Sequence, residues 1–356
     1  MAGYEQRLQK DLDRIAKRVR KMGKAVTASV GNSVKAALSR DAELATETIL
    51  GDLPTNRQSL ELDHRCHVFV ARHLPSAGHL RYISSVMRLN QTLERIGDYA
   101  ETISRAALSL SGAAPENVQR DIELVGERAL KTLRQALRSF QESDVDLARA
   151  TRESVSSFGT VFDKVFDDLV REGEEKTRPM KDLFAMMAIF NRLERVLHQA
   201  KEICQQTVFT VTGQTKPHKT FDILFVDNRN AGASVLAEHF AKKAYPEAGT
   251  FESAGWDTAD AVDEAYVAFG DTIGLNLVNE EPRHFGGQRS ELREYDIVID
   301  LAGGVHKHVK QVPFHTVLLS WRLEDRKDPA AVYKQLVPRL GELMLTLRGD
   351  EDEDDA

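Results

Sequence analysis

The chain contains 356 residues, which is enough for two or three domains that each bury their own core. Its formal charge of −7 comes largely from the acidic run Asp350 to Asp355, and a chain that is otherwise near neutral excludes nucleic acid as the main partner. Two distant cysteines, Cys66 and Cys204, exclude a disulfide framework. The longest apolar run, Leu183 to Phe190, is too short to cross a bilayer, so we expect a cytoplasmic protein that meets a membrane only through partners.

Residues from Tyr4 to about Thr212 are predicted to form long helices, because apolar residues recur every three or four positions and prolines are few. We expect six helices, arranged as two three-helix bundles over residues 1–113 and 114–213. The first helix is basic, with acids only at its start. That composition fits either a solvated face or a contact with an acidic partner surface.

An internal repeat supports this division. The stretch Leu93 to Ile103 returns as Leu193 to Ile203, at an offset of 100 residues. Met22-Gly23 likewise returns as Val125-Gly126, at an offset of 103. Because glycine inside a helix costs about 1 kcal/mol relative to alanine, we expect Gly23 and Gly126 to mark close approaches between helices.

Two acidic side chains share one face of the repeated helix in its first copy. Glu94 and Asp98 are four residues apart, and carboxylates at this spacing on adjacent helices can share a hard or borderline metal. Asp63, on the preceding helix, is a candidate partner. The matching positions of the second copy are occupied by Asp163, Glu194 and His198. The alternative is that these acids form solvated surface pairs worth roughly 0.3–0.5 kcal/mol each.

After residue 213 the pattern changes. Residues 214–220 are polar and contain a proline, and we interpret them as a linker. Residues 221–348 alternate short apolar runs with helical periods, which indicates an α/β domain with a parallel sheet. We expect strands at Phe221–Val226, Gly249–Ala254, Asp296–Leu301 and His315–Leu319, and helices near Ser234–Ala241, Ala259–Gly274 and Ala330–Leu347. Residues 349–356 are interpreted as a disordered acidic tail.

The helical part resembles the PhoU family of phosphate-uptake regulators over residues 1–214. The likeness is carried, in the family's order, by Met22-Gly23, Gly51-Asp52, Leu74 to Arg81, Leu93 to Asp98 and Val211 to Gln214. It implies a homodimeric regulator that dampens the phosphate-starvation response through the ATPase of a phosphate transporter and a sensor histidine kinase. It also implies a divalent or iron-type metal on the bundles, since some members carry metal clusters on Glu-x-x-x-Asp motifs.

The turn after the first expected strand lies where backbone N–H groups and a helix N-terminus can cradle an oxyanion. It resembles the Cys-x-x-Asn-x-x-Arg-Ser turn of low-molecular-weight tyrosine phosphatases and thioredoxin-coupled arsenate reductases, over residues 221–347. Asn230, Ser234 and the following Ala237-Glu238 keep that pattern. The later landmarks of the family fall at Glu252 to Gly255, Gly274 to Leu277 and Trp321 to Pro329.

Two departures argue against the family's catalysis. Asp227 stands in place of the nucleophilic cysteine, and Ala233 stands in place of the arginine that grips the oxyanion. No cysteine occurs after Cys204, so the domain has no thiol to form a covalent intermediate. We therefore define a degenerate phosphate loop, used for binding rather than chemistry, from Asp227, Asn230, Gly232, Ala233 and Ser234.

Three roles remain open for Asp227. It can cap a helix or bond the amides of its own turn. It can hold a cation together with another acid, for which Asp300, Asp325 and Asp328 are the candidates. It can also act as the nucleophile of an aspartyl-phosphate reaction.

Taken together, the sequence predicts a PhoU-like negative regulator of phosphate transport and phosphate-starvation signalling. We expect it to act by protein contacts and to carry a pseudophosphatase domain that is not an enzyme. The alternative is a phosphatase or arsenate reductase-like enzyme whose chemistry does not use a thiol.

Overall fold

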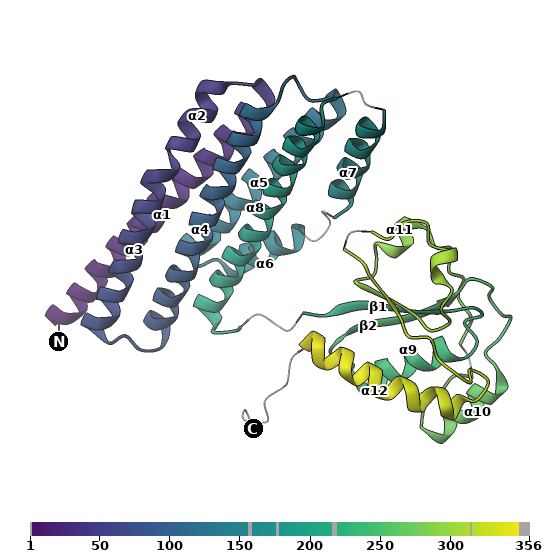
Figure 1. The fold of residues 1–356 in the computed structure, drawn as a ribbon. Coiled ribbons are helices and arrows are strands. Elements are labelled where there is room, and N and C mark those ends of the chain that lie inside the picture. Colours follow the sequence, from purple (N-terminus) through teal and green to yellow (C-terminus); the bar gives the residue numbers. More distant parts are fainter. Residues whose placement is uncertain are drawn as a thin grey trace. The chain divides into compact units, whose positions relative to one another are not determined.

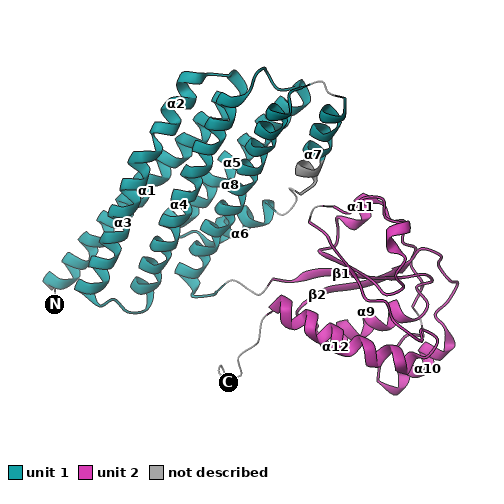
Figure 2. Ribbon diagram, viewed as in Figure 1, with its two compact units in different colours: residues 1–216 teal, residues 217–356 magenta. Residues whose placement is uncertain are grey.

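The computed structural model describes residues 2–155, 159–175, 178–215, 219–278, 280–313 and 315–348, apart from the side chains at position 2 and at 159–163. The chain divides into two compact units, residues 1–216 and 217–356 (Figure 2). The predicted linker, residues 214–220, spans this division. The predicted tail, residues 349–356, lies outside the described residues.

The first unit is all-helical (Figure 1). Its described residues form eight helices where six were expected, because the middle segment of each repeat is broken into a short and a long helix. In the first repeat the break falls at Gly51, and Pro54 in the next turn has no N–H to continue the ladder. The helices of the first repeat are α1 (Ala2–Ser39), α2 (Ala42–Leu50), α3 (Asp52–His73) and α4 (Ala77–Ser109). Those of the second are α5 (Glu116–Glu142), α6 (Val145–Ser154), α7 (Gly159–Glu174) and α8 (Met180–Thr212).

Both repeats turn from their first helix into their second in the same way. Arg40 and Ser143 adopt left-handed φ angles of 57° and 55°. The next residues, Asp41 and Asp144, each accept the N–H of the residue three positions later at 2.9 Å. Such caps satisfy N–H groups that the first helical turn leaves without partners. The repeat in the sequence is therefore also a repeat in the structure.

The apolar stripe of the repeated motif lies in the core of this unit. Leu93, Ile96 and Ala100 on α4 are fully buried, and so are Leu193 and Val196 on α8. The two helices pack side by side, so both copies contribute to one continuous core. Burial of each Leu or Ile contributes about 1.5–3 kcal/mol relative to exposure, and the motif is first of all an element of the fold. Within the described residues, no helix combines the length and apolarity needed to cross a bilayer.

The repeats also meet through α1 and α5, at the two glycines. A Cβ atom on Gly23 would lie 3.2 Å from Leu137 Cδ1, and one on Gly126 would lie 2.7 Å from Val34 Cγ1. Gly126 is the repeat counterpart of Gly23, and Leu137 is the counterpart of Val34. The same contact is thus made twice, once in each direction, as at a two-fold interface. The predicted close approach is confirmed.

The second unit is an α/β domain with a four-stranded parallel sheet, which confirms the predicted fold class (Figure 1). Its strands are β1 (Phe221–Asp227), β2 (Gly249–Gly255), β3 (Ile297–Asp300) and β4 (Val317–Ser320). They lie in the sheet in the order β2-β1-β3-β4. Its described helices are α9 (Ala233–Ala244), α10 (Glu264–Thr272), α11 (Arg289–Leu292), the 3₁₀ turn η1 (Val305–Lys307) and α12 (Pro329–Arg348).

Each face of the sheet has its own apolar cluster. Ile223 and Phe225 of β1 belong to the cluster that includes residues of α9 and α12. Leu224 and Val226 belong to the cluster on the other face. This alternation follows from the two-residue period of a strand, and it determines toward which face each residue at the strand ends points.

The helix expected from Ala259 begins at Glu264 instead. The segment before it is not helical because its N–H groups serve the turn that follows β1. Three of them donate to carbonyls of that turn: Asp257 to Asn228, Ala259 to Arg229 and Asp263 to Ala231.

Replacing Gly126 by alanine is expected to destabilise the helical unit by about 1–3 kcal/mol, because the new Cβ would overlap Val34 and force α1 and α5 apart. Gly31→Ala is the matched control. Its Cβ would lie 3.8 Å from Leu130, an ordinary contact distance, and alanine favours the helix by up to about 1 kcal/mol. Urea unfolding followed by helical circular dichroism compares the two variants, and equal midpoints would contradict this account of the interface.

Candidate functional site

The degenerate phosphate loop lies at the centre of the sheet's carboxyl edge. It leaves the end of β1, which pairs with β2 on one side and with β3 on the other. The strand order changes direction between β1 and β3, and open α/β sheets bind ligands at such a switch point. The loop runs from Asp227, the last residue of β1, to Ser234 in the first turn of α9.

The carboxylate of Asp227 fills this loop. Its Oδ1 accepts the N–H groups of Arg229 at 3.0 Å and of Asn230 at 2.7 Å, and its Oδ2 accepts the N–H of Ser234 at 3.0 Å. The residue is only 7% exposed. Among the roles left open for Asp227, the geometry is that of an acceptor for the amides of its own turn. The carboxylate is therefore an internal acceptor for three N–H groups of this loop.

Asn230 ties the loop to the strand beside it. It adopts a left-handed φ of 49°, which asparagine tolerates better than most residues. Its Nδ2 donates to Ser234 Oγ at 3.1 Å and to Ser253 Oγ at 2.8 Å, while its Oδ1 accepts the N–H of Arg283 at 2.6 Å. Asn230 and Ser234 are both buried, so they support the loop from within rather than presenting groups to a ligand.

Glu238, which keeps the resembled family's pattern in the sequence, is a further support of the loop, although its burial could not be predicted. This carboxylate is only 2% exposed and accepts Ser253 Oγ–H at 2.5 Å. Lys242 at 2.5 Å and Arg283 at 3.3 Å compensate its charge, as a buried carboxylate requires. The signal available in the sequence was a Glu–Lys pair four residues apart. Such a pair is usually an exposed surface pair, so its spacing alone does not reveal burial.

The remaining loop residues are packed from below. A Cβ atom on Gly232 would lie 2.7 Å from the ring of Tyr266, and Ala233 is buried in the apolar cluster beneath the loop. Burial and then the nearby Asp227 carboxylate raise the pKa of Tyr266, whose hydroxyl donates to the carbonyl of Arg326 at 2.7 Å. The small residues at positions 232 and 233 therefore leave room for the Tyr266 ring to pack directly against the loop.

Of the acids considered as cation-binding partners of Asp227, Asp300 and Asp328 bond backbone N–H groups of their own turns. Asp300 is in register with Val226, so Asp227, one residue further along, points to the opposite face of the sheet. Asp325 lies in a turn with a left-handed φ of 48°, and Asp328 accepts the N–H of Ala330 at the start of α12. The fully buried carboxylate of Asp300 accepts three N–H groups of the turn after β3, at 2.8–3.0 Å, from Ala302, Gly303 and Val305.

In the helical unit, the structure brings Asp52, rather than Asp63, to the acidic pair on α4. Ser59 on α3 donates to Glu94 at 3.3 Å, and this contact fixes the register of α3 against α4. Burial raises the pKa of Asp98, and the nearby Asp52 carboxylate raises it further. Asp63 lies about 16 Å beyond Asp52 along α3. Its carboxylate pairs with His67 on the same helix.

The second bundle has a different set of groups at the matching positions. Glu194 lies 4.0 Å from the Nε2 atom of His198, which takes the place of the second acid. Lys201 stands where the first copy has Glu101. The side chain of Asp163 lies outside the described residues. The two copies of the motif therefore differ in charge although they share their packing.

The acidic cluster of the first bundle, formed by Asp52, Glu94 and Asp98, suits a cation only in part. Burial raises the pKa of Asp52, Glu101 and Glu94 raise it further, and its Oδ1 is buried without a hydrogen-bond partner. Nevertheless, no three His, Cys, Asp or Glu side chains of the described residues are arranged as metal ligands. The two thiols do not supply ligands either, because burial raises the pKa of both Cys66 and Cys204 to about 12.

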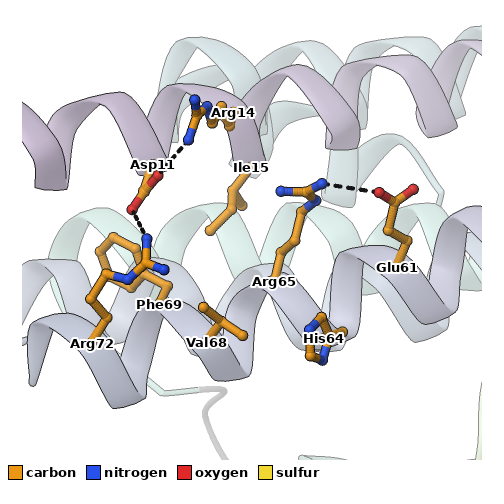
Figure 3. Close-up of a pocket in the computed structure, with 9 residues that line it drawn as sticks. All are labelled: Asp11, Arg14, Ile15, Glu61, His64, Arg65, Val68, Phe69 and Arg72. Carbon is orange, nitrogen blue, oxygen red and sulfur yellow. Dashed lines mark hydrogen bonds and ion pairs between the residues drawn. The ribbon is translucent and has the colours of Figure 1, made fainter.

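A pocket of about 330 Å³ lies between α1 and α3 (Figure 3). Its charged side chains pair with one another: Asp11 with Arg72 at 3.2 Å, and Glu61 with Arg65 at 3.0 Å. Buried His73 bonds Asp11 at 3.1 Å and is the main cause of the lowered pKa of that carboxylate. We interpret this pocket as a set of ion pairs that stabilises the packing of α1 against α3, rather than as a ligand site.

The fold defines a two-part protein: a duplicated three-helix bundle, and an α/β unit in which the loop after β1 bonds the carboxylate of its own Asp227. Residues 19–107 and 122–207 each match the PhoU domain. The helical unit of this chain belongs to the PhoU family.

A PhoU sequence and a PhoU structure agree with this assignment, whereas a third similar protein, a tyrosine phosphatase, is not a PhoU protein. The phosphate-specific transport system accessory protein PhoU of Serratia marcescens is 28% identical over 219 residues, which is 60% of this chain and 88% of the relative. The crystal structure of PhoU from Pseudomonas aeruginosa matches 58% of this chain and 99% of its own length, with a TM-score of 0.56 and 26% identity. The tyrosine phosphatase Wzb from Escherichia coli K30 matches 36% of this chain and 99% of its own length, with a TM-score of 0.31 and 20% identity.

Asp227→Asn is expected to destabilise the second unit by about 2–3 kcal/mol, because an uncharged amide replaces an anion that accepts three N–H groups. Both tryptophans, Trp256 and Trp321, lie in this unit, so fluorescence-detected urea unfolding reports on it selectively. Asp257→Asn, at an exposed carboxylate beside the loop, is the matched control and should change stability by less than about 0.5 kcal/mol. Equal midpoints for the two variants would contradict the internal-anion account.

Proposed function

We propose that this chain is a negative regulator of a phosphate-specific transport system, and that it acts by protein contacts rather than by catalysis. The first part is supported by the match to the accessory protein of Serratia marcescens, which extends over 88% of that protein. The observation that carries the second part is the Asp227 carboxylate, which occupies the loop that would have to bind phosphate.

The chemistry of the second unit supports a binding role. A thiolate is the nucleophile in the enzymes that the loop resembles, and the chain's two cysteines both lie in the helical unit with strongly raised pKa values. Both oxygens of Asp227 accept N–H groups, and these hydrogen bonds withdraw negative charge from the oxygens and so weaken the carboxylate as a nucleophile. The second unit thus acts as a pseudophosphatase domain that binds a partner.

The partners we propose are those that the family resemblance implies, namely the ATPase of a phosphate transporter and a sensor histidine kinase. The helical unit makes these contacts from the cytoplasm, as a homodimer, and reaches the membrane only through them. Nucleic acid is not a partner, because the chain carries a net charge of −7.

Deletion of the gene is expected to switch on phosphate-responsive transcription in phosphate-replete medium, because the negative regulator is lost. A transcriptional reporter measures the effect, and the wild-type full chain should restore repression. Gly126→Ala, which strains the α1–α5 interface, should restore it less well than the control Gly31→Ala. Unchanged phosphate uptake and unchanged reporter activity in the deletion strain would refute the proposed function.

We also propose that any metal of the helical unit is a divalent or iron-type cation on the face of Glu94 and Asp98. Two observations support this position: the buried Asp52 Oδ1 has no partner, and neighbouring carboxylates raise the pKa of Asp98. A cation would relieve that repulsion. The second bundle, with His198 beside Glu194, is then empty or binds differently.

Mn²⁺ should therefore raise the thermal unfolding midpoint of the chelator-treated full chain, and Asp98→Asn should abolish that rise. Without metal, Asp98→Asn should itself stabilise the protein at neutral pH. The folded pKa of Asp98 is raised, so its ionised form opposes folding, and the benefit of the substitution disappears as pH falls below the carboxyl's ordinary range. Asp63→Asn, on the same bundle but outside the cluster, is the control. A midpoint that Mn²⁺ leaves unchanged would remove the metal proposal.

A further inference from the structure

Helix α1 is unusually one-sided in its charge. Between Arg14 and Ser39 it contains no aspartate or glutamate. Over the same span it carries seven basic residues, namely Arg14, Lys17, Arg18, Arg20, Lys21, Lys24 and Lys35. Arg14 and Arg18 form ion pairs with Asp11 of α1 and Glu61 of α3. Most of the other basic residues lie further along the helix.

A groove of about 490 Å³ runs between α1 and α5, at the contact between the two repeats. Gly23 and Gly31 form part of its lining, and the helices approach closely at Gly23. Its polar lining consists of Lys24, Thr27, Asn32, Arg134, Arg138 and Gln141. In contrast to the pocket between α1 and α3, this groove has no carboxylate among the described residues that line it.

The cations of the groove are largely available to a ligand. Lys24 and Arg134 are exposed, and neither forms an ion pair or a side-chain hydrogen bond with another described residue. Arg138 uses its Nε to donate to Glu142 at 2.9 Å, which leaves its two terminal nitrogens for other acceptors. Three cations, of which only Arg138 is paired with a carboxylate among the described residues, make the groove a site for an anion.

The other side chains of the groove narrow the class of anion. No aromatic ring lines it, so it offers no platform on which a nucleotide base can stack. Apart from Leu137 and Ala28 it has no apolar lining, so a peptide would find few hydrophobic anchors. Planar guanidinium groups together with hydroxyl and amide groups match phosphoryl oxygens, which accept several hydrogen bonds at once.

We propose that the groove between α1 and α5 binds a small anion that carries two or more phosphoryl groups. Lys17, Lys21 and Lys35 follow the same helical spacing as Lys24 and Gly31, so they extend the positive face along α1. Because these lysines lie in a row along the helix, they match a ligand with several neighbouring negative charges better than a single phosphate. The site lies outside the degenerate phosphate loop, and the inference does not depend on the transport role proposed above.

Calorimetric titration of the full chain with inorganic tripolyphosphate tests the site. We expect saturable binding that weakens as salt is added, and weaker binding of inorganic phosphate. Arg134→Gln combined with Arg138→Gln should weaken tripolyphosphate binding at least about tenfold, because two charge-assisted contacts are lost. The matched control is Lys131→Gln combined with Arg95→Gln, which removes the same charge at exposed positions outside the groove. Equal weakening by both pairs would reduce the effect to net charge and overturn the proposal.

A second pair of variants tests the groove without changing any charge. Gly31→Leu should block binding because its side chain would project into the groove, whereas Gly31→Ala should retain it. Circular dichroism establishes that both variants are folded. Tripolyphosphate binding by Gly31→Leu at the wild-type affinity would place the anion elsewhere and refute the proposal. Vesicles of phosphatidylcholine with phosphatidylglycerol separate a lipid headgroup from a free anion, and binding to vesicles alone would also refute it.

Discussion

The second unit depends on one carboxylate that is held by three backbone N–H groups. At the end of its central strand the loop leaves these groups without backbone acceptors, and Asp227 supplies the negative charge that satisfies them. Asp300 repeats the same solution at the end of the neighbouring strand, on the opposite face of the sheet. The edge at which an open α/β sheet normally receives its ligand is thus closed by the chain itself.

The helical unit combines symmetric packing with asymmetric chemistry. The buried stripes of α4 and α8 and the reciprocal contacts at Gly23 and Gly126 are repeated almost without change, because a substitution there would cost packing energy. The exposed positions are free of that constraint and have diverged, as Asp98 and its counterpart His198 illustrate. A duplicated bundle can therefore keep one stable fold and still present a different surface from each half.

How much the sequence could predict depended on whether the determining interaction was local. The strands, the loop and the glycine contacts could be predicted, because apolar period, turn chemistry and helix propensity act over a few residues. The residue that lies beside Glu94 could not be predicted. Asp63 was expected from the repeat, but the register of α3 against α4 is set by a contact between Ser59 and Glu94. The start of α10 and the burial of Glu238 likewise depend on parts of the fold that are distant in sequence.

The central claim is that the Asp227 carboxylate replaces a bound oxyanion and that the protein regulates without catalysing. Hydrolysis of para-nitrophenyl phosphate by the purified full chain, with and without Mg²⁺, tests this claim most directly. The account predicts no hydrolysis above the buffer rate, either for the wild-type chain or for Asp227→Ala. Hydrolysis by the wild-type chain that Asp227→Ala abolishes would contradict it, because the carboxylate would then be a nucleophile rather than an internal anion.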